Sequence, residues 1–178
     1  MNQDPFERLA VDLRRAFDAS FATPMESAEL DEEAFVAIGV ADTPYAVRLS
    51  QIRGIHAEKT LVRLPSPLPS LLGVTGIRSD VIPVYGIRSF LAHPIETEAP
   101  RWLLLAGSAE TVALAFDRFE GHLRVPRANV ADVRGDASTS HVRKVVALAD
   151  TKRPLIDVES IVSEIRRQVA AAGLDKEP

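Results

Sequence analysis

Hydrophobic and polar residues alternate with a period of two along most of the chain from Phe35 onward, a pattern typical of short, half-buried strands. The alternation predicts strands over 35–40, 45–49, 52–56, 61–64, 74–77, 81–85, 102–106, 111–116, 121–125, 142–148 and 154–158. Residues that favour turns separate these runs at intervals of roughly 8–12 residues. So many short strands in succession indicate a mainly β protein of the small-barrel class.

Helical periodicity replaces this alternation near the N-terminus. Asp4 and Pro5 make a favourable helix start, and six apolar residues follow at spacings of three and four: Phe6, Leu9, Ala10, Leu13, Ala16 and Phe17. An acidic stretch over 26–33 is expected to be a linker. We therefore divide the chain into an extension, residues 1–33, and a main domain, residues 34–172. The amphipathic helix of the extension either packs back on the domain or docks a partner, and the sequence leaves both open.

A second helix is expected to close the main domain. Asp157 can cap its start, and its apolar face consists of Ile161, Val162, Ile165 and Val169. Gly173 lies just past its end, where a glycine commonly terminates a helix. A single helical turn is also expected over 86–92, before Pro94.

Residues 73–88 form the stretch around which the domain is organised. Two apolar half-strands, 74–77 and 81–85, meet at the polar turn Arg78-Ser79-Asp80. Pro83 lacks an amide donor, which places it at a sheet edge, a strand start or a bulge. A guanidinium at the tip of a rigid apolar hairpin suits docking better than catalysis. From the residues alone, Arg78 is either such a contact residue or an ordinary solvent-facing turn arginine.

The same stretch, Gly73-Val-Thr-Gly-Ile-Arg-Ser-Asp-Val-Ile-Pro-Val-Tyr-Gly-Ile-Arg88, resembles the hallmark of the CheW family of chemotaxis coupling proteins and kinase regulatory domains. That family has Gly-Val-x-Asn-Leu-Arg-Gly-x-Ile-Val-Pro-Val-x-Asp-Leu-Arg, and Arg78, Pro83 and Arg88 fall on matching positions. Val112-Ala-Leu-Ala-Phe-Asp117 resembles a later strand of the family, and 142–148 with 154–158 resembles its closing hairpin. The resemblance extends from about Ala34 to Val162.

The resemblance implies a fold of two SH3-like, five-stranded β-barrels packed around a common apolar seam. It also implies a non-catalytic adaptor that couples the cytoplasmic tip of a methyl-accepting-type receptor to the regulatory domain of a CheA-like histidine kinase. A receptor helix would lie in a groove between the barrels, and exposed barrel ends would contact the kinase. The candidate protein-binding residues, expected in the groove and on its rim, are Val74, Ile77, Arg78, Val81 and Ile82, with Ile52 and Ile55 as weaker candidates. For Arg88 and Asp117 we expect structural roles.

Composition and motifs argue against several other function classes. The 178-residue chain has no cysteine and a formal net charge of −4, which disfavour thiol chemistry and a basic, phosphate-binding face. Its four histidines are scattered along the chain: His56, His93, His122 and His141. Neither a nucleophile elbow nor a nucleotide-binding glycine loop occurs in the sequence. We therefore expect no enzyme, no metal, no cofactor and no nucleic-acid partner.

The hydrophobic residues are distributed as in a water-soluble domain. They make up 46% of the chain, yet no run reaches the roughly 20 apolar residues of a membrane-spanning helix. We expect a cytoplasmic protein without direct membrane insertion. Recruitment to membrane-anchored receptor clusters would come through its partners.

Four polar positions depart from the family pattern. Gly54 stands where the family usually has Glu, Gly76 and Ser79 replace the Asn and Gly that flank the hallmark arginine, and Gly86 replaces an Asp. Packing tolerates such changes, but partner contacts depend on particular polar groups. One alternative is therefore a divergent scaffold for another pathway, such as surface motility or development. A small-barrel module for nucleic acid or a small ligand is a further alternative, disfavoured by 6% aromatic residues and an acidic charge.

Overall fold

The computed structural model describes residues 31–94, 100–108, 110–133 and 141–173. Residues Glu33–Pro178 form one compact unit, and the fold below is that of this unit. The helix expected over 4–20 and most of the expected linker lie outside the described residues. The division of the chain between residues 33 and 34 therefore stays a prediction.

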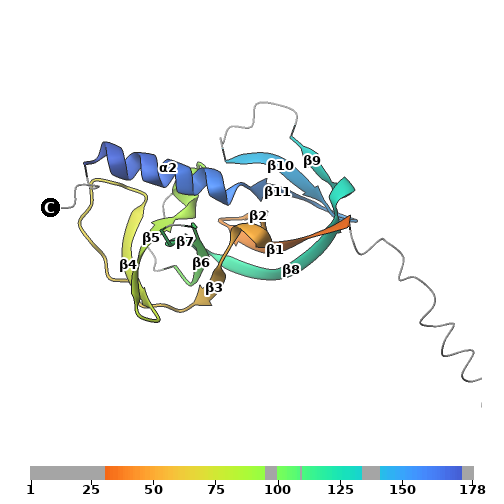
Figure 1. The fold of residues 1–178 in the computed structure, drawn as a ribbon. Coiled ribbons are helices and arrows are strands. Elements are labelled where there is room, and N and C mark those ends of the chain that lie inside the picture. The colour runs from red at the N-terminus through yellow and green to blue at the C-terminus, as the bar shows by residue number, and fades with distance from the viewer. Residues whose placement is uncertain (1–30, 95–99, 109, 134–140, 174–178) are drawn as a thin grey trace, which may run out of the picture. The chain divides into compact units, whose positions relative to one another are not determined.

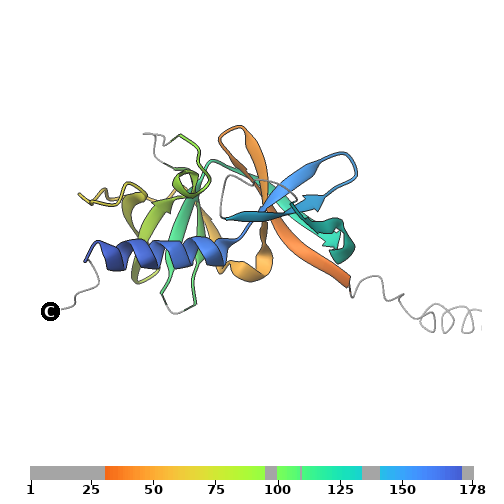
Figure 2. The same cartoon turned by 90° about the horizontal axis from the view of Figure 1, so that it is seen from above.

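Two curved β-sheets lie side by side in this unit (Figures 1 and 2). We call the six-stranded sheet barrel 1; its strand order is β8 (Arg118–Pro126), β1 (Glu32–Val40), β2 (Thr43–Arg48), β11 (Lys152–Ile156), β10 (Val142–Ala147) and β9 (Val130–Asp132). We call the five-stranded sheet barrel 2; its order is β3 (Gly54–Ala57), β6 (Trp102–Ala106), β7 (Val112–Phe116), β5 (Asp80–Gly86) and β4 (Leu71–Ile77). The predicted mainly β fold with two barrel-like subdomains is confirmed, with the short β9 adding a sixth strand to the first.

The two barrels use the chain differently. Barrel 2 consists of consecutive strands, β3 to β7, whereas barrel 1 combines β1 and β2 with β8 to β11 from the other end of the domain. The two parts of barrel 1 meet where β2 and β11 pair in parallel, with Ala46 opposite Leu155. Barrel 2 is therefore an uninterrupted segment inserted between the halves of barrel 1.

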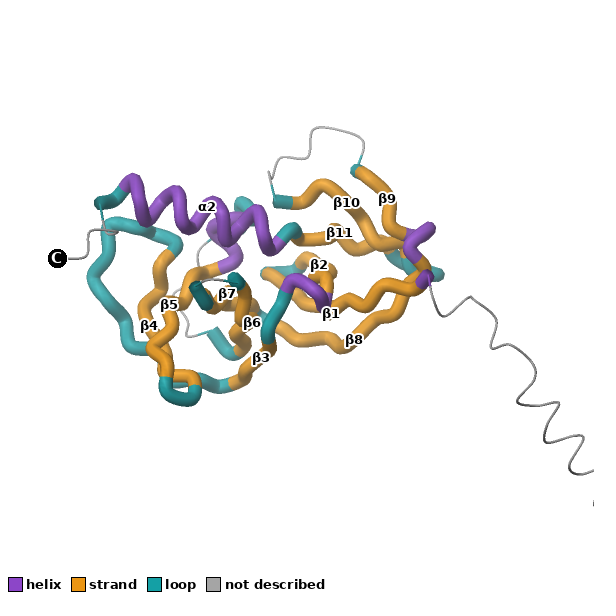
Figure 3. Tube along the Cα trace, viewed as in Figure 1, coloured by secondary structure: helices purple, strands orange, loops and turns teal. Residues whose placement is uncertain are grey.

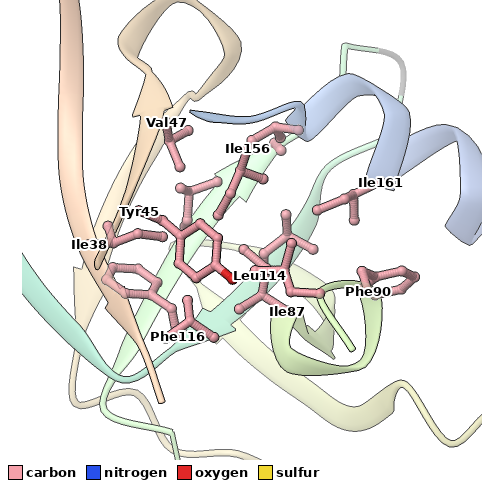
Figure 4. Packing of buried hydrophobic residues seen from close by; sticks show 14 of the residues in the cluster. Ile38, Tyr45, Val47, Ile87, Phe90, Leu114, Phe116, Ile156 and Ile161 are labelled. Carbon is pink, nitrogen blue, oxygen red and sulfur yellow. The ribbon is translucent and has the colours of Figure 1, made fainter. Parts of the chain in front are cut away.

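An apolar seam joins the barrels. Its buried residues come from both sheets and from α2 (Val158–Ala171); Figure 4 labels Ile38, Tyr45, Val47, Ile87, Phe90, Leu114, Phe116, Ile156 and Ile161. Alternating strand residues supply this cluster, because every second side chain of a strand points to the same face. Burial of these side chains is the main force that holds the two barrels together.

The closing helix has the predicted start, face and end. The Asp157 carboxylate accepts a hydrogen bond from the Ser160 amide at 3.2 Å and so caps the helix. Ile161, Val162 and Ile165 are buried in the seam, and Val169 packs against it. Gly173 follows the helix with φ +68°, the left-handed conformation that glycine adopts most readily.

Three short 3₁₀ helices complete the described elements: η2 (Leu49–Gln51), η3 (Ile87–Phe90) and η4 (Arg127–Asn129). The segment η3 is the single helical turn expected over 86–92. One predicted strand, 61–64, is wrong: only Val62 pairs there, in an isolated bridge to Val74. Three prolines over 65–69 prevent the segment from extending its pairing along β4. It belongs to the long loop between β3 and β4, drawn in teal in Figure 3.

Candidate protein-binding surfaces

An open groove of about 460 Å³ lies where residues of both barrels meet. Its lining consists of Leu49, Ile52, Arg53, Gly54 and Ile55 from the η2–β3 segment, Trp102 from β6, and Phe119 and His122 from β8. Ile52 and Ile55 are half-buried and pack against the seam, so each has apolar surface left for a partner. The groove predicted between the barrels thus contains the two residues regarded as the weaker candidates.

A row of rings forms one wall of the groove. The Trp102 ring stacks on buried Phe116 at a centroid distance of 6.3 Å and packs against Phe119 at 5.4 Å. The Phe119 ring contacts His122 edge-on at 5.6 Å. Sequence reasoning missed Trp102 and Phe119, because the strands that carry them come together only in the folded barrels. The one signal available was that Trp102 is the single tryptophan of the chain, a residue type enriched in protein-binding sites.

The other five candidate residues lie on a second surface, the hairpin of β4 and β5, which we call the tip hairpin. Ile77 and Ile82 point into barrel 2 and are only 4% and 5% exposed, so they support the hairpin from inside. Val74 is half-buried, whereas Val81 is 75% exposed. None of the five is among the residues that line the groove. The structure therefore divides the seven candidates between two surfaces.

Val81 is uncovered because of its neighbour across the hairpin. It pairs with Gly76, which has no side chain, and a Cβ at Gly76 would have no heavy atom within 4 Å. Val62, 56% exposed, reaches the same hairpin through two backbone hydrogen bonds of 2.8 Å with Val74. Pro83 stands opposite Val74. The Val74 amide and carbonyl both bond to Val62, so this position of β4 needs no hydrogen bond from Pro83, which has no amide donor.

Arg78 occupies the first position of the two-residue turn between Ile77 and Asp80. Its φ of +57° lies in the left-handed region, which costs a non-glycine residue roughly 1–2 kcal/mol. Within the described part of the chain, its side chain has neither a hydrogen bond nor an ion pair. Two-residue hairpin turns require a positive φ at this position, so the conformation follows from the turn itself.

Gly73 fixes the base of the tip hairpin. Its φ is +146°, and an added Cβ would lie 2.2 Å from the Val62 carbonyl oxygen. Only a glycine permits this approach of the β3–β4 loop to β4. The hairpin is therefore a rigid projection with an apolar face and a cationic tip.

Two of the four histidines are hydrogen-bonded within the fold. His93 Nε2 lies 2.9 Å from the Tyr45 hydroxyl, and His141 Nδ1 lies 2.8 Å from the Ser160 hydroxyl. Burial lowers the pKa of His141, although the Asp157 carboxylate acts in the opposite direction. Burial also raises the pKa of Tyr45. These contacts give both histidines structural roles.

No cluster of three or more metal-ligating side chains occurs among the described residues. No helix in the described ranges is both long and apolar enough to cross a membrane.

Comparison with known proteins identifies the class. The model of the CheW-like domain family matches residues 34–166. Protein FrzA of Myxococcus xanthus is 25% identical over 146 residues, which cover 79% of this chain and 91% of FrzA. The crystal structure of the scaffolding protein TtCheW from Thermoanaerobacter tengcongensis superposes with a TM-score of 0.63 at 11% identity, covering 70% of this chain and 88% of that one.

Paired barrels with a groove at their junction are the architecture of this chain, and the likeness to TtCheW shows the same fold. The chain belongs to the CheW-like domain family, whose members are non-catalytic scaffolds that couple receptors to kinases. The central hairpin, the later strands and the closing hairpin all lie inside the matched range.

Proposed function

We propose that this protein couples a chemoreceptor-type protein to a chemotaxis-type histidine kinase and uses a separate surface for each. The groove binds the cytoplasmic tip of a methyl-accepting-type receptor. The tip hairpin binds the regulatory domain of a CheA-like kinase. The observation that carries this proposal is the groove between the barrels, lined by aliphatic side chains and aromatic rings.

The shape and lining of the groove suit an amphipathic helix. Such a helix presents apolar side chains at spacings of three, four and seven residues, and it docks them in an apolar trough. Ile52 and Ile55 supply aliphatic surface to the groove, and Trp102 supplies a large ring. Tryptophan at the centre of an interface commonly contributes most of the binding energy.

The tip hairpin suits a flat, partly polar partner. Val81 and Val74 offer a small apolar face, and Arg78 offers five donors in a fixed fork at its edge. The similar barrels of a kinase regulatory domain would meet this face, and an acidic side chain there would pair with Arg78. Ile77 and Ile82 would act from beneath by holding the hairpin in shape.

The family match over residues 34–166 supports the remaining parts of the proposal. The CheW-like domain comprises residues 34–172, and residues 1–33 form an extension of it. The protein performs no catalysis, binds no nucleic acid and works in the cytoplasm, where its partners recruit it to receptor clusters.

Binding measurements with single variants test the two-surface proposal. The receptor tip and the kinase regulatory domain of the same organism are titrated separately by isothermal titration calorimetry, with Trp102 fluorescence as a second signal. Ile55→Asp is expected to weaken receptor binding by about tenfold or more and to leave kinase binding unchanged, and Arg78→Glu is expected to do the reverse. Val133→Asp changes an exposed valine away from both surfaces and serves as the control. If the wild-type protein failed to bind the receptor tip or failed to bind the kinase regulatory domain, the two-surface proposal would be overturned.

A second candidate function is that of a scaffold for a pathway other than chemotaxis, such as motility or development. The positions of the departures from the family pattern favour it. Gly54 lines the groove, and Gly76 and Ser79 lie on the tip hairpin. Gly86, by contrast, packs against Leu72 inside the fold. Three of the four changes thus fall on the proposed partner surfaces, and titration against the several receptors and kinases of one organism would identify the pathway.

A further inference from the structure

A polar cluster joins the two barrels near the end of β7. The Asp117 carboxylate accepts hydrogen bonds from Arg88 Nη2 at 2.8 Å and from Arg88 Nε at 3.1 and 3.2 Å. The same carboxylate accepts one from the Ala41 amide at 2.5 Å. We call Ala41, Arg88 and Asp117 the clasp.

The clasp residues come from different barrels. Ala41 belongs to the turn between β1 and β2 in barrel 1, and Arg88 belongs to η3, which follows β5 of barrel 2. Asp117 lies where the chain leaves β7 of barrel 2 and enters β8 of barrel 1. Two further hydrogen bonds link neighbouring residues: Arg118 Nη1 donates to the Ala41 carbonyl at 3.0 Å, and the Tyr45 hydroxyl lies 2.9 Å from His93 Nε2. The clasp therefore ties both barrels to one carboxylate.

This crossing segment also builds the wall of the groove. Phe116 immediately precedes Asp117 and stacks on Trp102, and Phe119 follows two residues later and packs against the same Trp102 ring. A shift of the backbone at Asp117 must move both neighbours of Trp102. The apolar seam and a 3.3 Å hydrogen bond from the Asp117 amide to the Gly39 carbonyl also hold this segment. Apolar contacts are non-directional, whereas the charge-assisted hydrogen bonds of the clasp have a fixed geometry and so add orientation.

We infer that Arg88 and Asp117 are positioning residues for partner binding: they set the orientation of the two barrels and thereby the position of the aromatic wall. This inference rests on the proposed function, in which the groove binds the receptor tip. It assigns a role in binding to two residues that do not line the groove.

The positioning role can be measured without any partner. The emission of the single Trp102 reports the packing of the wall. The chain has no cysteine, so Arg143→Cys on β10 and Asp80→Cys on β5 place one spin label on each barrel. Double electron–electron resonance then gives the distribution of distances between the two labels. Calorimetric titration of the receptor tip then gives the dissociation constant.

Asp117→Asn and Arg88→Met remove the ion pair with little change of side-chain volume. Arg88→Lys keeps the positive charge but loses the planar guanidinium and its paired donors. The control is Glu33→Gln, which breaks the Glu33–Arg48 ion pair within barrel 1. The side chains of Glu33 and Arg48 are 23% and 22% exposed, compared with 25% and 13% for those of Asp117 and Arg88. We expect Asp117→Asn and Arg88→Met to shift Trp102 emission to longer wavelength, to broaden the distance distribution and to weaken receptor binding about five- to tenfold. Arg88→Lys should lie between them and wild type, and Glu33→Gln should match wild type in all three measurements.

The inference is overturned if the two clasp variants match Glu33→Gln in Trp102 emission and in the distance distribution. Should Arg88→Met fail to fold, Asp117→Asn and Arg88→Lys decide the same question. If wild type itself does not bind the receptor tip, the proposed function fails, while the two partner-free measurements still decide whether the clasp positions the barrels and the wall.

Discussion

Each barrel has a hairpin whose two-residue turn begins with a non-glycine residue in the left-handed region. In barrel 1 that residue is Ala41, with φ +51°, and in barrel 2 it is Arg78, with φ +57°. Ala41 is held on both sides, because its amide donates to Asp117 and its carbonyl accepts from Arg118. Arg78 has no such contact within the described residues.

The comparison separates two uses of the same strained turn. At Ala41 the cost of the backbone conformation is offset inside the molecule, where the turn forms part of the junction between the barrels. At Arg78 no described contact offsets the cost, so we infer that the exposed guanidinium serves the external contact proposed above. The backbone conformation alone does not indicate a binding site, since both turns share it.

The largest effect is expected from Gly73→Ala, which tests whether the tip hairpin is rigidly anchored. The new Cβ would lie 2.2 Å from the Val62 carbonyl oxygen at a φ of +146°, so either the loop or β4 must move. We expect a loss of about 3 kcal/mol in unfolding free energy, measured by urea titration. Gly76→Ala, where space is open, should stay within about 0.5 kcal/mol of wild type. Equal losses for the two variants would mean that the hairpin is not anchored at Gly73.

Asp117→Ala tests the internal support of the Ala41 turn. Removal of the carboxylate takes three hydrogen bonds from Arg88, only 13% exposed, and leaves the Ala41 amide without its acceptor. We expect a loss of about 2 kcal/mol. Asp80→Ala, beside the Arg78 turn, is the matched control and should change stability by less than about 0.5 kcal/mol. If Asp117→Ala and Asp80→Ala unfolded at the same urea concentration, the Ala41 turn would have no more internal support than the Arg78 turn.

Ala41→Gly and Arg78→Gly relieve the same backbone strain in the two hairpins. Each should raise the unfolding free energy by about 0.5–1 kcal/mol, because the relief of the left-handed conformation exceeds the added entropy of the unfolded chain. Only Arg78→Gly should weaken binding of the kinase regulatory domain. Thermal unfolding and calorimetric titration of both variants check this pair of results, and unchanged kinase binding by Arg78→Gly would refute the inference about an external contact.

The smallest effect concerns His141, which lies against the closing helix and away from both turns. Its pKa is lowered by burial, so below its ordinary value of about 6.5 the unfolded chain takes up a proton that the folded chain does not. Stability should therefore fall as the pH falls from about 6.5 toward the folded pKa. Asp157, Arg143 and Arg167 surround the ring electrostatically and are the same in wild type and variant.

His141→Asn should lose less stability than wild type between pH 7.5 and pH 5.5, values on either side of the ordinary histidine pKa of about 6.5. The measurement is urea unfolding of both proteins at each pH. Parallel loss of stability in the two proteins would show that His141 does not titrate differently on folding.

Much of the fold could be predicted because strand alternation and helix caps are local signals. The tip hairpin and the helix from Asp157 to Gly173 were both predicted from neighbouring residues. The strand over 61–64 was predicted wrongly, since an apolar run next to prolines does not reveal that only Val62 finds a partner. Alternation also shows that Val81 and Ile82 face opposite sides, but not which side is the interior.

The site was harder to predict, because it depends on the order of strands in the sheets. All seven candidates were predicted for the groove and its rim, but only Ile52 and Ile55 line it. Trp102 and Phe119 join them only through pairing of β3 with β6 and of β8 with β1. The clasp presents the same difficulty: Arg88 and Asp117 were expected to be structural, and nothing in the sequence indicates that one carboxylate serves residues of both barrels. Contacts between distant segments need a topology, which local patterns do not supply.

The insertion of barrel 2 between the halves of barrel 1 has a consequence for biosynthesis. All five strands of barrel 2 have left the ribosome once residue 116 is exposed, so this subdomain can mature while translation continues. The edge of β2 that pairs with β11 stays unpaired until residues Lys152–Ile156 emerge from the ribosome. A nascent polypeptide arrested before that point would display an unpaired strand edge, and we expect chaperones to bind it there.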